Sequence, residues 1–563
     1  EQVAVIEAPA AAQLVVAGAG SGKTETMAAR VVWLVANGQV DPDQVLGLTF
    51  TRKAAAELSE RIARRLRGLR TAGLWTPRLD DGTGAEVLGG TPTVSTYHAY
   101  AGRLVREHAL RVGVEPESRL LSQAAAWQYA AEVVARYDGP MDEVGWAEST
   151  VITAVVEIAG ELAEHLLTPE EMARYVDQVL ADLSAVPPGE GRRSAHPMRK
   201  VSEALAARRA LLPMVRGYLE LKRSRDSLDF ADQMALAARL ARDVPRVGLG
   251  ERVRFRAVLL DEFQDTSEAQ LVLLRSLFGA GAGALRRAGP EVGADNVVSV
   301  TAVGDPHQSI YGWRGASATT IARFPAEFGT GGRAGAAGAV DGAGVAAAVR
   351  PLRTSWRNDL AILDVANLVS APLRRTARVP VPDLVARPDA SAGAVSVARA
   401  VTVEDEASAI ASWVRDRWAS PSGRRTGASA AVICRKRSQF PLVVEALRER
   451  GLPVEVVGLG GLLLTPEVAD LVALLWTVAD PARGDQLMRL LTGPPVALGA
   501  ADLDGLHAWT RVLGRRAASA APTGAGATAG PAGRRTVDLA PDSVVEVSLA
   551  EAVRTDRELA DRH

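Results

Sequence analysis

The chain has 563 residues and a mass of 59.2 kDa, with 47% hydrophobic and 23% charged residues, as is typical of a globular protein of several domains. A net charge of −1 argues against a histone-like coat on DNA, but not against a motor that needs positive charge only in a groove. No apolar run is long enough to predict a membrane span. The single cysteine, Cys434, excludes an internal disulfide or a cysteine-based zinc cluster, and it favours a reducing cytoplasm.

Four apolar runs bounded by turn residues predict strands in the first part of the chain, at residues 13–17, 45–50, 257–260 and 297–303. Each run leads into a loop and then into a stretch with helical periodicity. This alternation is typical of a parallel sheet covered by helices. Between about residues 106 and 225 the pattern becomes helical, with no convincing strand, and predicts an all-α insertion. The fold class expected is therefore α/β.

A Gly/Ala-rich stretch at residues 329–348 predicts a flexible linker. A second α/β pattern follows it, with a strand expected at 394–401, a helix at 404–418 and a strand at 430–434. The domains expected are a first α/β domain in two parts, a helical insertion, a linker, a second α/β domain and the start of a second helical insertion. Their ranges are 1–105 with 225–328, 106–224, 329–350, 351–482 and 483–563, respectively.

A glycine-rich segment follows the first predicted strand and opens a helical stretch. Glycines allow backbone N–H groups to close around phosphates, Lys23 can reach the β- and γ-phosphates, and the Thr24 hydroxyl can bind Mg²⁺. An alanine stands where the first glycine is usual, but the strand–loop–helix context favours a phosphate loop over a simple turn. The candidate nucleotide-binding residues are Ala17, Gly18, Ala19, Gly20, Ser21, Gly22, Lys23 and Thr24.

An acidic pair, Asp261 and Glu262, ends another predicted buried strand. Carboxylates at such a place are costly unless a cation or water chemistry occupies them. Asp261 is suited to contact Mg²⁺, and Glu262 is suited to act as the base that orients the attacking water. A solvated strand end is the alternative for the pair alone. Together with the phosphate loop, the pair predicts an enzyme that hydrolyses a nucleoside triphosphate.

Further segments, in order along the chain, resemble motifs of the UvrD/Rep/PcrA/RecB helicases. They lie at residues 49–58, 96–98, 228–232, 261–265, 303–316 and 355–358. This resemblance implies RecA-like P-loop NTPase sheets with helical insertions, ATP and Mg²⁺ as cofactors, and 3′-to-5′ movement on single-stranded DNA. Residues 95–102 and 460–468 are most similar to the AdnB-type helicase–nuclease subunits of actinobacteria. That similarity implies DNA ends as substrates, double-strand break repair and a second helicase–nuclease subunit as a partner.

The resemblance also implies roles for single residues in the nucleotide site. Gln2 would read adenine, and Trp356 would stack on it in place of the family's usual tyrosine. Gln308 would sense the γ-phosphate. Arg357 would neutralise charge on the transferred phosphoryl group, reaching the site from the second domain when the cleft closes.

Four residues are implied to contact DNA: Phe50, His98, Tyr311 and Trp313. Exposed aromatic rings on a loop favour base stacking, which needs no particular sequence. The alternatives are core packing for Phe50, Tyr311 and Trp313, and an ordinary hydrogen-bonded histidine for His98.

The last two motor motifs of the family are not found between residues 481 and 563, nor is a nuclease signature. From the sequence alone we therefore expect a truncated motor. Two other functions remain open at this stage. One is a catalytically impaired fragment or partner subunit that binds nucleotide and DNA, and the other is a different P-loop enzyme such as a kinase.

Overall fold

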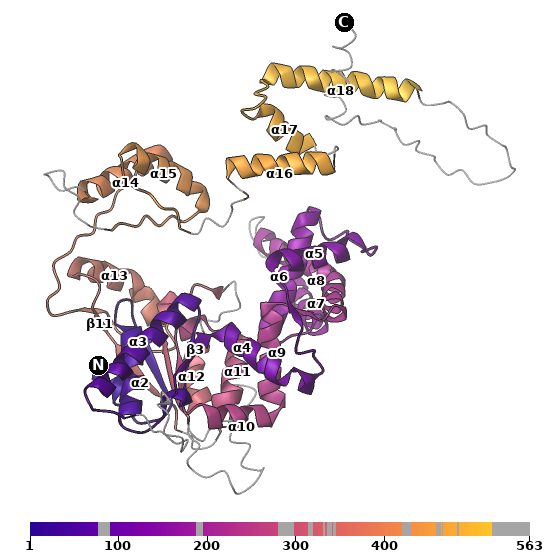
Figure 1. Cartoon of the computed structure of the whole chain (residues 1–563). Helices are drawn as coiled ribbons and strands as arrows, with labels where there is room; N and C mark the ends of the chain where they lie inside the picture. Colours follow the sequence, from indigo (N-terminus) through magenta and orange to yellow (C-terminus); the bar gives the residue numbers. More distant parts are fainter. Residues whose placement is uncertain are drawn as a thin grey trace. The chain divides into compact units, whose positions relative to one another are not determined.

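The computed structural model describes residues 1–76, 90–186, 195–279, 298–312, 319–329, 333–334, 340–341, 345–418, 429–457, 463, 465–480 and 484–520. The chain divides into two compact units, Glu1–Ser396 and Val397–His563 (Figure 1). No helix among the described residues is long and apolar enough to cross a membrane.

A six-stranded parallel sheet forms the centre of the first unit, in the strand order β10-β1-β7-β6-β2-β3. The four predicted strands are confirmed to within two residues, and all four are buried along their whole length, as parallel strands covered on both faces should be. The strands are β1 Gln13–Ala17, β2 Val45–Thr49, β3 Thr93–Thr96, β6 Ala257–Leu260, β7 Ser299–Gly304 and β10 Ala348–Leu352.

Helices cover both faces of this sheet. In β1, Leu14 and Val16 face one core while Val15 and Ala17 face the other, because successive strand residues point to opposite sides. One face packs against α2 and α3, and the other packs against α4, α9, α10, α11 and α12 (Figure 1). The bounds are α1 Gln2–Ile6, α2 Lys23–Ala36, α3 Arg52–Thr71, α4 Tyr97–His108, α9 Phe230–Asp243, α10 Pro245–Arg254, α11 Glu268–Phe278 and α12 Thr320–Phe328.

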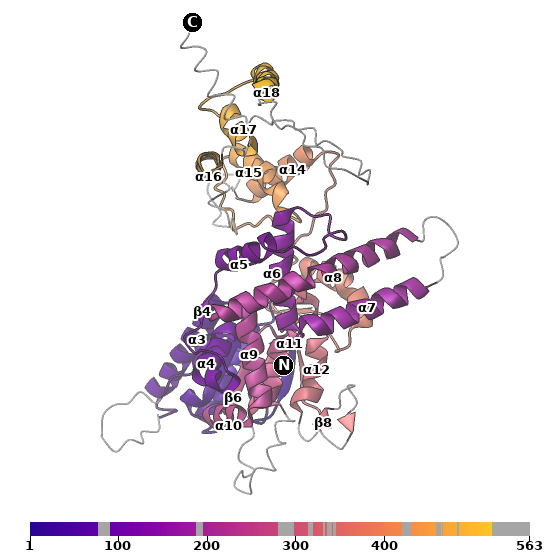
Figure 2. The same ribbon diagram turned by 90° about the vertical axis from the view of Figure 1, so that its right-hand side faces the viewer.

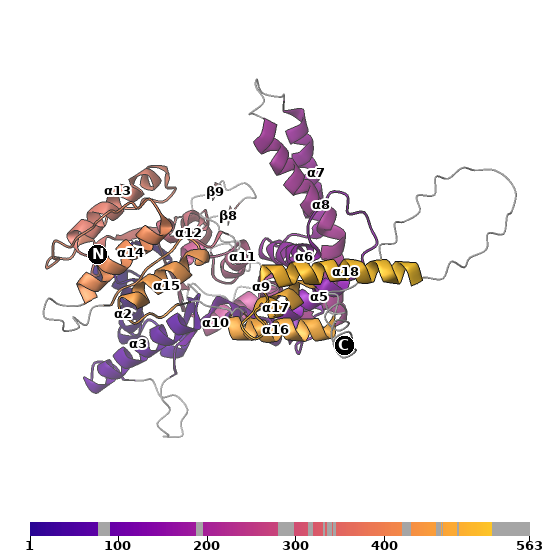
Figure 3. The same cartoon turned by 90° about the horizontal axis from the view of Figure 1, so that it is seen from above.

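Four helices form an insertion with its own core, which includes Val155, Leu211 and Tyr218. Helices α7 and α8 run side by side and project from the sheet (Figures 2 and 3). Two short strands, β4 and β5, pair where the chain enters and leaves the insertion, although no strand was predicted there. The bounds are α5 Gln123–Ala135, α6 Glu148–Glu164, α7 Pro169–Ala185, α8 Ala195–Ser224, β4 Arg119–Leu120 and β5 Ser227–Leu228.

The end of the predicted linker belongs to the central sheet, because β10 starts at Ala348 and pairs with β1. The first unit then continues through α13 (Leu360–Thr376) and a short pair of strands, β11 (Thr354–Ser355) with β12 (Val385–Ala386), to Ser396. Residues 351–396, which the sequence analysis assigned to the second domain, thus lie in the first compact unit. A separate antiparallel pair joins β8 (Arg333–Ala334) to β9 (Val340–Asp341).

The described part of the second unit is helical. The predicted helix at 404–418 is confirmed as α14, but the strands expected at 394–401 and 430–434 are wrong, since neither segment forms a ladder with a partner. An apolar extended segment becomes a strand only when another strand takes up its backbone hydrogen bonds. The helices are α14 Val403–Trp418, α15 Phe440–Glu449, α16 Pro466–Ala479, α17 Gly484–Thr492 and α18 Ala500–Ala520.

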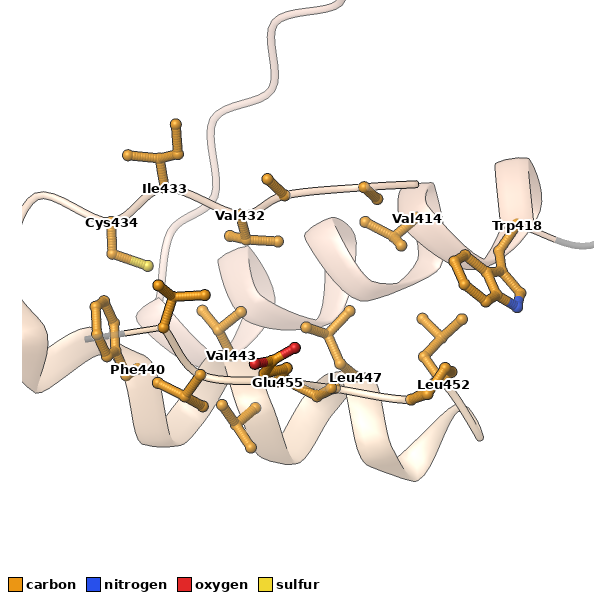
Figure 4. Close-up of a pocket in the computed structure, with 17 residues that line it drawn as sticks. Val414, Trp418, Val432, Ile433, Cys434, Phe440, Val443, Leu447, Leu452 and Glu455 are labelled. Carbon is orange, nitrogen blue, oxygen red and sulfur yellow. The ribbon is translucent and has the colours of Figure 1, made fainter. Parts of the chain in front are cut away.

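A cavity of about 360 Å³ lies between segments 430–434 and 453–457 and the helices α14 and α15. Figure 4 shows that Val432 and Cys434 point toward it whereas Ile433, which is 94% exposed, points away. Side chains therefore alternate along this segment as they would in a strand. The sequence pattern correctly indicated an extended segment. The prediction of a strand failed because no described strand pairs with this segment.

Candidate nucleotide and DNA site

The phosphate loop, residues 18–22, joins β1 to α2. Gly20 and Gly22 have φ of +75° and +80°, a region that glycine enters without strain. A Cβ on Gly20 would also lie 2.8 Å from Ser355 Oγ and from Arg357 Cβ. The loop therefore requires glycine for its shape and for its close neighbours, and it leaves backbone N–H groups at the start of α2.

The acidic pair lies directly against this loop. Lys23 Nζ is 3.0 Å from Glu262 Oε2, and Glu262 holds a left-handed backbone conformation (φ +49°) that is uncommon for a non-glycine residue. The Glu262 N–H donates to Asp261 Oδ1 (3.1 Å), and the Tyr97 hydroxyl donates to the Asp261 carbonyl (3.0 Å). Both carboxylates are thus held in place by specific contacts at the end of β6.

Negative charge is concentrated here beyond what Lys23 balances. Burial, and then the neighbouring Glu262 charge, raise the pKa of Asp261 to about 6. The same two causes raise the pKa of Asp265 to about 6. A carboxyl held in this way gains from a nearby cation, so Asp261 is suited to Mg²⁺, together with the Thr24 hydroxyl. Among the described residues, no cluster of three or more His, Cys, Asp or Glu side chains could hold a metal.

A line of hydrogen bonds leads from Glu262 to Gln308. Gln264 Nε2 donates to Glu262 Oε2 (2.9 Å), and Gln264 Oε1 accepts from the Asp305 N–H (3.0 Å). Gln308 Nε2 then donates to Asp305 Oδ2 (2.7 Å). The acidic pair after β6 is thus connected to the segment after β7. Gln264 and Asp305 lie inside motifs recognised in the sequence, but nothing in the sequence alone indicated that they join Glu262 to Gln308.

Three residues expected around the nucleotide base and phosphates lie near the phosphate loop. Gln2 Nε2 donates to the Ser21 carbonyl (3.2 Å), and the backbone N–H of Trp356 donates to the Gly20 carbonyl (2.8 Å). The Trp356 side chain is 53% exposed. Arg357 is exposed and makes no ion pair with another described residue. It belongs to the same compact unit as the phosphate loop. Its Cβ lies beside the loop, since a Cβ on Gly20 would be 2.8 Å from it.

A cavity of about 220 Å³ adjoins the same loop. It is lined by loop residues Gly18 and Ala19, by the segment after β7, and by Asn367 and Arg374 of α13. Arg374 is paired with Asp383 (2.5 Å). Arg374 was not predicted as a site residue, since a basic residue near a helix end is usually a solvated or capping group.

Aromatic residues gather at the carboxyl ends of β2 and β3. Phe50 lies 5.0 Å from Tyr97 between ring centroids and packs against the core. The His98 ring meets Phe230 edge-on at 5.8 Å. Phe230 is 50% exposed, and the sequence analysis missed it, although it lies in the segment at 228–232. Tyr311 is half-buried, and Trp313 lies outside the described residues.

Two family models and several curated proteins match this chain. A family model described as the UvrD/REP helicase N-terminal domain matches residues 1–329, and one described as the UvrD-like helicase C-terminal domain matches residues 352–513. Similar proteins include the ATP-dependent DNA helicase PcrA of Leuconostoc citreum, which is 26% identical over 88% of this chain and 54% of its own length. The ATP-dependent DNA helicase UvrD1 of Mycobacterium leprae is 28% identical over 86% and 53%. DNA helicase II of Escherichia coli is 25% identical over 91% and 58%.

The chain therefore spans about half the length of the curated relatives it matches. The first family model nevertheless covers 329 of its 563 residues, and that stretch contains the phosphate loop, the acidic pair and the hydrogen-bonded line to Gln308. The chain belongs to the UvrD/REP helicase family.

Proposed function

We propose that this chain is the motor of an ATP-dependent DNA helicase that moves 3′-to-5′ along single-stranded DNA. The observation that carries the proposal is the hydrogen-bonded line from Glu262 through Gln264 and Asp305 to Gln308. It links the residue assigned to hydrolysis with the segment that continues to Tyr311 and Trp313. A kinase or GTPase would have no need for such a link to an aromatic loop.

In this proposal the nucleotide is held by groups from several elements. Lys23 binds the β- and γ-phosphates, while Gln2 and Trp356 bind adenine. Thr24 and Asp261 would hold Mg²⁺, which would neutralise negative charge on the phosphates. The phosphate-loop N–H groups of residues 18–22 cradle the triphosphate.

Hydrolysis then depends on three side chains. Glu262 orients the attacking water and accepts its proton. Arg357 places a permanent positive charge beside the transferred phosphoryl group. Gln308 senses the γ-phosphate. It is joined through Asp305 and Gln264 to Glu262, and its own segment continues to Tyr311 on the DNA side.

Single-stranded DNA would lie along the aromatic residues at the ends of β2, β3 and β7. Stacking on Phe50, Tyr311 and Trp313, with His98 against the backbone, requires no base sequence. The half-exposed Phe230 beside His98 adds a further ring to this surface. A translocase needs such sequence-independent contacts, since it meets every base in turn.

The biological setting we propose is the repair of DNA double-strand breaks. Relatives named as DNA helicases support a role in DNA metabolism. The likeness of residues 95–102 and 460–468 to AdnB-type proteins supports DNA ends as substrates and a second helicase–nuclease subunit as a partner.

ATP hydrolysis measured with and without single-stranded oligonucleotide tests the function. We expect stimulation by DNA, and displacement of a labelled strand from duplexes with a 3′ overhang rather than a 5′ overhang. Turnover that DNA does not change would contradict the motor. ATP binding without turnover would instead support the alternative of a nucleotide- and DNA-binding fragment, and transfer of phosphate to an acceptor other than water would support a kinase.

A further inference from the structure

Arg30, in the middle of α2, is a charged side chain with 0% exposure. Its guanidinium donates to four backbone carbonyls of one segment: those of Val5 (3.2 Å), Ile6 (2.9 Å), Ala8 (2.7 Å) and Pro9 (2.9 Å). It also donates to two hydroxyls of β7, Thr301 Oγ1 (3.1 Å) and Ser299 Oγ (3.3 Å). Arg30 therefore connects three pieces of chain: the N-terminal segment, the phosphate-loop helix and β7.

No carboxylate among the described residues pairs with this cation. Burial, and then the charge of Arg350, lower the pKa of Arg30 to about 10, so the guanidinium remains protonated at neutral pH. Burying a cation without a counter-ion is costly unless its donors are satisfied. The carbonyls of Val5 and Ile6 end α1, and the negative end of a helix dipole favours a cation there.

The helix held in this way carries Gln2, whose amide reaches the phosphate loop at the Ser21 carbonyl. Helix α1 has five residues, too few to be stable alone, and Val5 is its buried residue. Gln13 Nε2 supports Arg30 by donating to the Val5 carbonyl (3.2 Å) and to Thr301 Oγ1 (3.3 Å). Glu1, at the near end of the helix, is paired with Arg353 (2.7 Å), and the Arg30 contacts hold the other end. Both sets of contacts therefore fix the place of Gln2 beside the phosphate loop.

We propose that Arg30 is a positioning residue for base recognition: it fixes the N-terminal segment so that Gln2 meets the adenine of ATP. This inference rests on the proposed role of Gln2. An apolar residue could fill the same volume but would remove the guanidinium donors from all four carbonyls, and those of Ile6 and Ala8 have no other donor among the described contacts. Lysine has three donors on one nitrogen and lacks the planar fork that spreads Arg30's contacts over two directions.

The test is the ratio of kcat/KM for ATP to that for GTP, measured with single-stranded DNA present. Gln2→Ala should lower this ratio about tenfold, the worth of one or two hydrogen bonds. Arg30→Met, which removes the donors but keeps a long side chain, should lower it by a similar factor, mainly through KM. The double variant should be no less selective than either single variant, since Arg30 acts through Gln2.

Two further variants keep the test decisive. Val31→Ala, at a fully buried neighbour in α2, should lower the melting temperature and leave the ATP-to-GTP ratio unchanged. If Arg30→Met does not fold, Arg30→Lys serves in its place, and we expect it to lower the ratio partially. An unchanged ratio in Gln2→Ala would overturn the adenine role itself. A lowered ratio in Gln2→Ala together with a wild-type ratio in the Arg30 variants would overturn the inference alone.

Discussion

Lys23 Nζ lies 3.0 Å from Glu262 Oε2, so the cation assigned to the phosphates and the carboxylate assigned to the water neutralise each other in this structure. An incoming triphosphate must draw the ammonium away from Glu262. That exchange frees the carboxylate to act as a base when the phosphates and Mg²⁺ are in place. In the proposed mechanism the ion pair therefore keeps the Glu262 carboxylate neutralised until a triphosphate binds.

Replacing Lys23 by alanine should abolish nucleotide-dependent activity, with ATP turnover falling more than about 100-fold, because a directed charge on the phosphates is lost. The fold should persist, since Lys23 belongs to no hydrophobic core among the described residues and its printed side-chain contact is the pair with Glu262. Circular dichroism and ATPase assays on the same preparation check both statements. Normal turnover in the folded variant would show that Lys23 does not bind phosphate.

Glu262→Gln should keep Mg·ATP binding and stop hydrolysis, with a loss of about 10²- to 10⁴-fold in kcat. An amide can hold the same place but cannot accept a proton. Equilibrium binding of a fluorescent ATP analogue, compared with turnover, separates the two effects. Loss of binding as complete as in Lys23→Ala would mean that Glu262 serves affinity and not the water.

Gln264→Ala should reduce the stimulation of ATP hydrolysis by DNA more than it reduces turnover without DNA. The change removes both hydrogen bonds that join Glu262 to Asp305. The matched control is Gln178→Ala, which removes an exposed glutamine paired with Asp182 on α7 and should leave the stimulation unchanged. Equal stimulation in Gln264→Ala and wild type would show that the line of hydrogen bonds carries no coupling.

Phe230→Ala should weaken binding to a short single-stranded oligonucleotide by about 1–3 kcal/mol, with little base preference, because stacking uses ring faces. The same result is expected for Trp313→Ala. Tyr175→Ala, which removes a ring that is 69% exposed on α7, is the control and should bind like wild type. Anisotropy titrations at one fixed salt concentration give the affinities. Wild-type affinity in Phe230→Ala would remove this ring from the DNA surface.

Glu164 gives a prediction on pH. It lies at the end of α6, one of its carboxylate oxygens has no partner among the described residues, and burial raises its pKa above the ordinary 4.5. The folded state therefore holds this proton more tightly than the unfolded chain, and stability falls as the pH rises from about 4.5 through the raised value. Glu164→Gln should thus be more stable than wild type at pH 7 and show no such gain at pH 4. Urea unfolding of both proteins at pH 7 and pH 4 measures the difference in stability. An equal difference at the two pH values would contradict the raised pKa of Glu164.

Local patterns were sufficient to predict the strands that carry the site. Residues 13–17 and 257–260 are apolar runs that end in a glycine-rich turn and an acidic pair, and each forms the strand expected. Local patterns failed where the formation of a strand depends on a neighbouring strand. Ala348 belongs to a Gly/Ala-rich stretch and yet begins a strand, because β1 offers it an edge. Val432 lies in a segment with a strand pattern and has no ladder.

Polar contacts between residues far apart in the sequence could not be predicted from local patterns either. Gln264 and Asp305 are 41 residues apart, and Arg30 meets Thr301 across 271. Such pairs depend on the strand order of the sheet, which apolar periodicity does not specify. From the sequence alone, a buried arginine in a helix cannot be distinguished from the basic residues on a solvated helix face.

Strand β10 also affects the free energy needed to bring Arg357 to the phosphates during catalysis. The carbonyl of its last residue, Leu352, accepts from the Gly18 N–H (3.4 Å), and the Trp356 backbone N–H donates to the Gly20 carbonyl (2.8 Å). Arg357 therefore follows a stretch of backbone that is fixed to the phosphate loop at two points. A charge that is already oriented before the reaction spends little free energy on reorganisation at the transition state. The backbone that carries Arg357 is therefore preorganised beside the phosphate loop within the first unit, and we expect the exposed side chain to reach the phosphates by a rotation on the nanosecond scale of exposed rotamers.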